Sequence, residues 1–144
     1  MGRLGYLLDS NICIHFMKNE GNVVERMKIV GLLNCFLSEI TVLELMYGIA
    51  NSQSSKKAEN KAKFELFVNG FSGRILPIRS AFDEFAAQKT QLRKLGTPIS
   101  DFDLLIACTS VANDLVMVSR NVKEMERVAG LKLENWIDEN FNKA

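Results

Sequence analysis

The sequence predicts an α/β fold: one domain with a parallel sheet of about five short strands, covered by helices on both faces. Short apolar runs alternate with helical patterns along the chain, and the main runs end at residues that favour turns and helix caps. The length of 144 residues fits one domain of ordinary size. Hydrophobic residues make up 47% and charged residues 24%, as in globular proteins. We therefore expect residues 1–144 to form a single folded unit.

In the first half of the chain, two strands are each followed by a helix. The apolar run 6–8 is a buried strand, because Asp9, Ser10 and Asn11 after it favour a helix start. A helix over 22–30 leads to a second strand within 32–37, and Ser38 can cap the next helix. The polar, Lys-rich segment 52–63 predicts a loop and the solvated start of a further helix, before the apolar stripe of 64–71.

The second half continues the alternation. Residues 74–78 predict a short strand, which Pro77 places at an edge or strand end. Ser80 opens a helix that ends near Leu95. One face of this helix carries Phe82, Phe85, Ala86, Lys89 and Leu92. Ser100 or Asp101 caps a central, buried helix. The strand 115–118, a helical turn over 122–128 and a last strand 131–133 follow. Such alternation is typical of a parallel sheet.

Charge and cysteine content exclude several functional classes. Lys and Arg number 18 and Asp and Glu 17, so the net charge of +1 indicates no general attraction for nucleic acid, and binding would need a local patch. The single histidine, His15, excludes a zinc site that needs two. Cys13, Cys35 and Cys108 form no CxxC pair and favour a reducing cytoplasm. The longest nearly apolar run, 29–37, is too short for a transmembrane helix, so we expect no membrane association.

Acidic and amide side chains follow the predicted strands. Asp9 comes directly after the first strand and Glu44 lies within two turns of the helix after the second. Asp103 is in the first turn of the buried helix, and Asn121 follows the strand 115–118. The carboxyl ends of parallel strands share one edge, where ligands bind. Crowded carboxylates raise one another's pKa unless a cation neutralises them, and oxygen ligands favour Mg²⁺ or Mn²⁺. The pattern predicts a divalent-metal phosphate site.

Each acid also has a purely structural interpretation. Asp9 can cap the helix that it precedes. Residues 41–44 match a capping box, which would give Glu44 a structural role. Asp103 can interact with the helix dipole, with Asp101 as the better cap. The joint occurrence of the three acids at successive strand ends favours the functional interpretation.

Five segments, 6–14, 40–48, 96–107, 116–128 and 130–136, together resemble PIN-domain ribonucleases, and specifically the VapC toxins of type II (VapBC) toxin–antitoxin systems. The resemblance covers almost the whole chain, beyond which residues 137–144 form a C-terminal extension of unknown role. It implies an α/β sandwich, Mg²⁺- or Mn²⁺-dependent endoribonuclease activity on tRNA or another structured RNA, and a VapB-like antitoxin. It also implies a homodimer within the toxin–antitoxin complex.

The resemblance also assigns site residues. Asp9 and Asp103 would hold the ion together with Glu44, which would position the attacking water or accept its proton. Ser10, Asn11, Ser119 and Asn121 would support them. Many PIN domains have Asp where this chain has Asn121, and we expect Glu124, one helical turn later, to replace that acid in catalysis. Candidate RNA-binding cations are Arg120, Lys123 and Arg127, which flank the predicted site, and Lys89.

Two other functions are considered. A strand followed by Asp9 also begins haloacid-dehalogenase-type phosphatases, but those need a second Asp two residues later, where this chain has Asn11. A PIN scaffold weakened by Asn121 would bind RNA or a protein partner without cleaving RNA.

Overall fold

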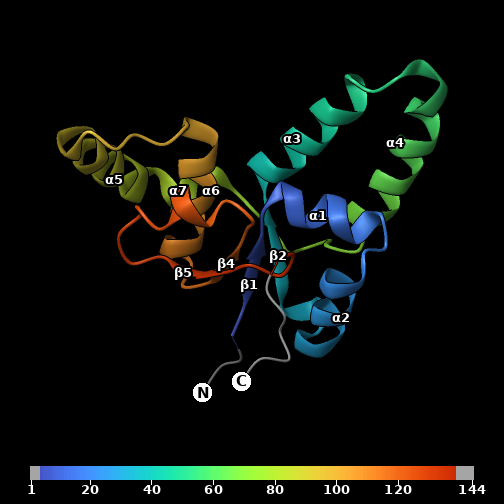
Figure 1. Ribbon diagram of the computed structural model, residues 1–144, viewed down its shortest axis with the longest axis horizontal. Coiled ribbons are helices and arrows are strands. Elements are labelled where there is room, and N and C mark those ends of the chain that lie inside the picture. Colours follow the sequence, from blue (N-terminus) through green and yellow to red (C-terminus); the bar gives the residue numbers. More distant parts are fainter. Residues whose placement is uncertain (1–3, 139–144) are drawn as a thin grey trace.

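Five parallel strands form one sheet in the computed structural model, which describes residues 4–138 (Figure 1). In chain order they are β1 (Tyr6–Leu8), β2 (Cys35–Ser38), β3 (Ile75–Leu76), β4 (Val116–Val118) and β5 (Lys132–Glu134). Their order across the sheet is β3-β2-β1-β4-β5, and every pairing is parallel. The predicted fold class is confirmed, and β3 lies at an edge, as Pro77 indicates.

Helices cover both faces of this sheet. The α-helices of the described residues are α1 (Ser10–Met17), α2 (Gly21–Val30), α3 (Glu39–Ala50), α4 (Ser54–Asn69), α5 (Phe82–Leu95), α6 (Asp101–Ala112) and α7 (Val122–Met125). Figure 1 shows α1 and α2 on one side of the sheet and α5, α6 and α7 on the other, while α3 and α4 form a projecting hairpin. No helix within residues 4–138 has both the length and the apolar character needed to cross a membrane.

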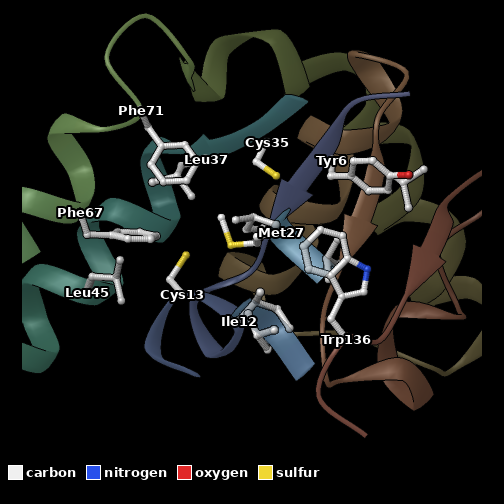
Figure 2. Packing of buried hydrophobic residues seen from close by; sticks show 14 residues of the cluster. Tyr6, Ile12, Cys13, Met27, Cys35, Leu37, Leu45, Phe67, Phe71 and Trp136 are labelled. Carbon is white, nitrogen blue, oxygen red and sulfur yellow. The ribbon is translucent and has the colours of Figure 1, made fainter. Parts of the chain in front are cut away.

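Two hydrophobic clusters, one on each face, hold the layers together. Tyr6 and Leu8 face the cluster beneath α1 and α2, whereas Leu7 between them faces the cluster beneath α5 and α6, because successive strand residues point to opposite faces. Figure 2 shows the first cluster, in which Phe71 and Trp136 pack among residues from β1, β2, α1 and α2. Cys13, Cys35 and Cys108 are buried free thiols within the two clusters.

Segment 52–63 contains less loop than predicted, because α4 already begins at Ser54, and the predicted solvated start of this helix is confirmed. Its first turns are exposed, and Glu59 pairs with Lys63 at 3.4 Å across one helical turn. Lys, Glu and Ala are good helix formers, and they sustain these first turns without an apolar face. Most of the polar segment is thus the solvated start of a helix, and only residues 52–53 belong to the loop before it.

Other boundaries differ by single turns. Leu32–Asn34 and Ile78–Ala81 are 3-10 turns that precede β2 and α5, so α5 begins at Phe82 rather than at Ser80. The helix ends at Leu95, as predicted, because Gly96 adopts the left-handed conformation with φ 71°. The predicted apolar face of α5 is partly wrong: Gln88 and Leu92 are buried, whereas Phe82 and Lys89 are exposed.

Gln88 joins α5 to the turn after α7. Its side chain donates to the Ala129 carbonyl at 2.7 Å and accepts from the Ala129 N–H at 3.1 Å. Gln88→Ala should lower the free energy of unfolding in urea by about 1–3 kcal/mol, because it leaves both backbone groups without this partner. The exposed Gln91→Ala on the same helix is the control. Equal stability of the two variants would contradict this role of Gln88.

Candidate active site

The candidate site lies where the strand order reverses. β1 and β4 are neighbours, but the chain continues from β1 to β2 on one side and from β4 to β5 on the other. In open α/β sheets, ligands bind at such a switch point, beyond the carboxyl ends of the strands. Asp9 follows β1 and Ser119 follows β4. The Asp9 N–H donates to the Val118 carbonyl at 2.9 Å, and the Ser119 hydroxyl donates to Asp9 Oδ2 at 2.7 Å.

Asp9 is a buried carboxylate with a fixed orientation. Its side chain is also the N-cap of α1, accepting from the Ser10 N–H at 2.8 Å, and Asn11 Nδ2 lies 3.5 Å from Oδ2. Burial raises the pKa of Asp9, the hydrogen bonds from Ser119 and Ser10 oppose this increase, and the charge of Asp103 adds to it. The capping interpretation is therefore confirmed, and it leaves Oδ2 directed toward Ser119.

Glu44 and Asp103 reach the same place from α3 and α6. Ser38 caps α3 by accepting from the Thr41 N–H at 3.1 Å, so Thr41 is an interior helix residue and the predicted capping box is wrong. Of the two predicted caps of α6, Ser100 is confirmed, because it accepts from the Asp103 N–H at 3.4 Å, and Asp101 is the first residue of the helix instead. Both caps are hydroxyl side chains, and neither Glu44 nor Asp103 serves as one.

The three acids interact electrostatically. Burial raises the pKa of Glu44, the charges of Asp9 and Asp103 raise it further, and the nearby Ser10 hydroxyl opposes this increase. Glu44 Oε1 is buried and has no hydrogen-bond partner within the part of the chain that the structure describes. In that part, no three Asp, Glu, His or Cys groups already converge tightly enough to enclose an ion. The three acids thus lie in one region beyond the carboxyl ends of the strands, but they do not form a complete coordination site.

Asn121 and Glu124 flank this region. The Asn121 N–H donates to the Ser119 hydroxyl at 3.0 Å, so Ser119 connects the turn before α7 to Asp9. Glu124 is exposed on α7 and is not among the described charges that shift the pKa of Asp9 or Glu44. Its catalytic role stays a prediction.

The four candidate cations are exposed, and three have polar partners. Arg127 Nη1 donates to the Pro98 carbonyl at 3.0 Å, and Lys89 pairs with Asp101 at 2.9 Å. Lys123 is exposed on α7, and Arg120 pairs with Asp138. Sequence reasoning missed Asp138 and its neighbour Asn135. Both follow β5, so the rule that identified Asp9 and Asn121 could have found them.

Neutralising Glu44 should stabilise the metal-free protein at neutral pH. Because the pKa of Glu44 is raised in the folded state, its ionisation lowers stability as the pH rises from about 4 through that raised pKa. Glu44→Gln should therefore increase the melting temperature at pH 7, with little change near pH 4. Calorimetry in EDTA, with the exposed Glu65→Gln as control, measures this. A lower melting temperature at pH 7 would contradict the prediction.

The geometry thus defines an α/β protein with an acidic site at its switch point, and comparison with known proteins gives the family. The PIN domain matches residues 6–131. The tRNA(fMet)-specific endonuclease VapC of Shigella flexneri is 35% identical over 135 residues, covering 92% of this chain and 98% of the relative. Ribonuclease VapC2 of Rickettsia felis is 32% identical, covering 91% and 97%.

Solved structures agree. The crystal structure of VapBC2 from Rickettsia felis, bound to a DNA fragment from its promoter, contains a chain that matches with a TM-score of 0.80 and 28% identity. The match covers 92% of this chain and 99% of that one. The chain belongs to the PIN-domain family, in the group of the VapC ribonucleases.

Proposed function

We propose that this PIN-domain protein is the toxin of a toxin–antitoxin pair, an endoribonuclease that uses Mg²⁺ or Mn²⁺ to cleave tRNA or another structured RNA. One observation carries the proposal. At the switch point of the sheet, the carboxylates of Asp9, Glu44 and Asp103, which come from three separate segments, interact electrostatically. The names of the relatives from Shigella flexneri and Rickettsia felis, an endonuclease and a ribonuclease, support it.

The donor set fits a hard divalent cation. All three side chains offer oxygen, which Mg²⁺ and Mn²⁺ prefer. Glu44 Oε1 has no described partner, and mutual repulsion contributes to the raised pKa of Asp9 and Glu44. Asp9 and Asp103 would hold the ion with Glu44. When bound, the ion would offset the negative charge that develops on the phosphoryl oxygens.

The side chains of this protein supply orientation and proton transfer. The side chains of Ser119 and Asn11 and the backbone N–H of Ser10 fix the Asp9 carboxylate by donating to it. Glu44 would position the attacking water or accept its proton. We retain Glu124 as a more distant negative charge. Glu124→Gln should then lower cleavage and raise the Mg²⁺ requirement.

Local cations would bind the RNA backbone, since the net charge is only +1. Arg120, Lys123 and Arg127 follow β4 and Lys89 lies on α5, so all four come from segments close to Ser119 or to the start of α6. Contacts with phosphates would select RNA by shape and charge rather than by base sequence.

A groove beside the acids offers a place for the antitoxin. It has a volume of about 350 Å³ and lies between α1, α3 and α4, with Ile14, Leu45 and Phe64 among its apolar lining residues and Glu44 at one side. We propose that a segment of a VapB-like antitoxin occupies it and reaches the acids. The VapBC2 complex from Rickettsia felis supports such a partner.

We also propose a homodimer and a cytoplasmic location. Leu43, Met46 and Tyr47 are exposed on one side of α3, at the spacing of a helical contact surface. The three buried free thiols suit a reducing compartment.

Incubation of the purified full-length protein with total RNA tests the proposal. We expect discrete fragments with Mg²⁺ or Mn²⁺, no cleavage in EDTA, and recovery on adding the metal back. RNA binding without cleavage at any metal concentration would instead favour the non-cleaving scaffold. If the protein neither binds nor cleaves RNA, the proposed function is rejected.

A further inference from the structure

An arginine and an aspartate that follow adjacent strands form a bidentate pair at the edge of the candidate site. Val118 of β4 pairs with Glu134 of β5, and the Ser119 N–H continues the ladder to the Glu134 carbonyl at 3.0 Å. The next residues of both segments therefore lie side by side. Arg120 Nε and Nη2 donate to the two carboxylate oxygens of Asp138 at 3.2 and 3.1 Å.

The Asp138 carboxylate is held in place from its own segment. The buried Asn135 accepts from the N–H groups of Ile137 and Asp138 at 2.8 and 3.1 Å, and its amide donates to Asp138 Oδ2 at 3.0 Å. Hydrogen bonds from Asn135 and Arg120 hold the pKa of Asp138 below its usual range, so it is ionised at neutral pH. Arg120 thus meets a carboxylate whose position is set by a buried side chain.

Arg120 is also tied to the acids themselves. Its N–H donates to Asn11 Oδ1 at 3.2 Å, and the amide of Asn11 lies 3.5 Å from Asp9 Oδ2. The residue before it, Ser119, donates to the same Asp9 oxygen. The backbone of Arg120 is therefore joined to the Asp9 hydrogen-bond network through Asn11, while its guanidinium contacts Asp138 at the border of that network.

We propose that Arg120 binds an RNA phosphate beside the acids, and that Asp138 competes with this phosphate for the guanidinium and so weakens RNA binding. The inference rests on the proposed RNA-cleaving function. A guanidinium binds a carboxylate and a phosphate with the same two-pronged geometry. Both side chains of the pair are about half exposed, at 51% and 50%, so RNA can reach the pair. Such exposed pairs are weak enough to be exchanged for a phosphate. This gives residue 138 of the proposed extension a function, whereas residues 139–144 lie outside the described residues.

Equilibrium binding of bulk tRNA tests the competition. Fluorescence anisotropy at low salt would use the full-length protein with Asp103→Asn throughout, so that the RNA stays intact. Adding Asp138→Asn should tighten binding about two- to fivefold, the effect of losing one exposed ion pair. The gain should disappear when Arg120→Gln is also present, because the two residues act through one contact. Asp138→Ala should give the same result.

Asp114→Asn is the matched control. It removes the same charge from an exposed aspartate that pairs with Lys132 at 2.8 Å, before β4 and therefore at the opposite end of that strand. A gain from Asp138→Asn no larger than that from Asp114→Asn, or one that persists with Arg120→Gln, would overturn the competition while leaving RNA cleavage intact. No tRNA binding by the parent protein would contradict both this inference and the proposed function.

Discussion

Asp103→Asn should abolish growth arrest when the protein is expressed in bacteria without an antitoxin. The substitution keeps the shape of the side chain and removes one of the three interacting charges. The backbone N–H of residue 103 makes the cap contact with Ser100, so α6 keeps its start. RNA cleavage by the purified variant should fall by about 10²–10³-fold, the loss typical for removing one charge-stabilising group from an active site.

Asp101→Asn is the control for this loss. Asp101 lies two residues earlier in the same helical turn and is exposed. It forms an ion pair with Lys89, whereas Asp103 interacts with the other two acids of the site. Circular dichroism and thermal melting would show that both variants are folded. Full toxicity of a folded Asp103→Asn protein would exclude Asp103 from the mechanism.

Phe71→Ala should lower the free energy of unfolding by about 3–5 kcal/mol, the usual cost of removing a buried phenylalanine. Phe71 is 1% exposed and packs its ring 5.0 Å from that of Phe67, on the cluster beneath α1 and α2 (Figure 2). Arg74 lies over the same ring, at 5.4 Å from its centroid. The substitution would leave a cavity between α4 and the sheet.

Urea denaturation measures the effect, with Phe82→Ala as the control because Phe82 is 52% exposed. A loss below about 1 kcal/mol for Phe71→Ala, or equal losses for the two variants, would show that the segment after α4 contributes little to the core.

The fold could be predicted because strands and helices alternate and the strands are short and apolar. Helix caps were less predictable. Ser38 was identified as a possible cap of α3, but residues 41–44 also match a capping box. The structure decides between them, because α3 begins at Glu39. The residue within 52–63 at which α4 starts could not be predicted, because a polar segment fits both a loop and a solvated helix. Lys89 was assigned to an apolar stripe of α5, but packing buries Leu92 of that stripe and leaves Lys89 exposed.

The candidate site was predictable to the extent that it follows strand ends. Asp9 and Ser119 directly follow neighbouring strands, so the parallel topology brings them together. Side-chain packing decides which oxygen of Asp9 accepts from Ser119. It also decides that one oxygen of Glu44 has no partner among the described residues. The strand-end rule could have identified Asp138 as a candidate, but not its contact with Arg120, which depends on β4 and β5 being adjacent.

Calorimetric titration of Mn²⁺ into the purified protein tests most directly whether the three acids form one metal site. We expect binding by the unmodified chain, strong weakening by Asp9→Asn, and weakening by Glu44→Gln and Asp103→Asn. Glu65→Gln, on the exposed side of α4, should bind Mn²⁺ like the unmodified chain. Unchanged Mn²⁺ affinity in all three acid variants, or no binding by the unmodified chain, would contradict the account.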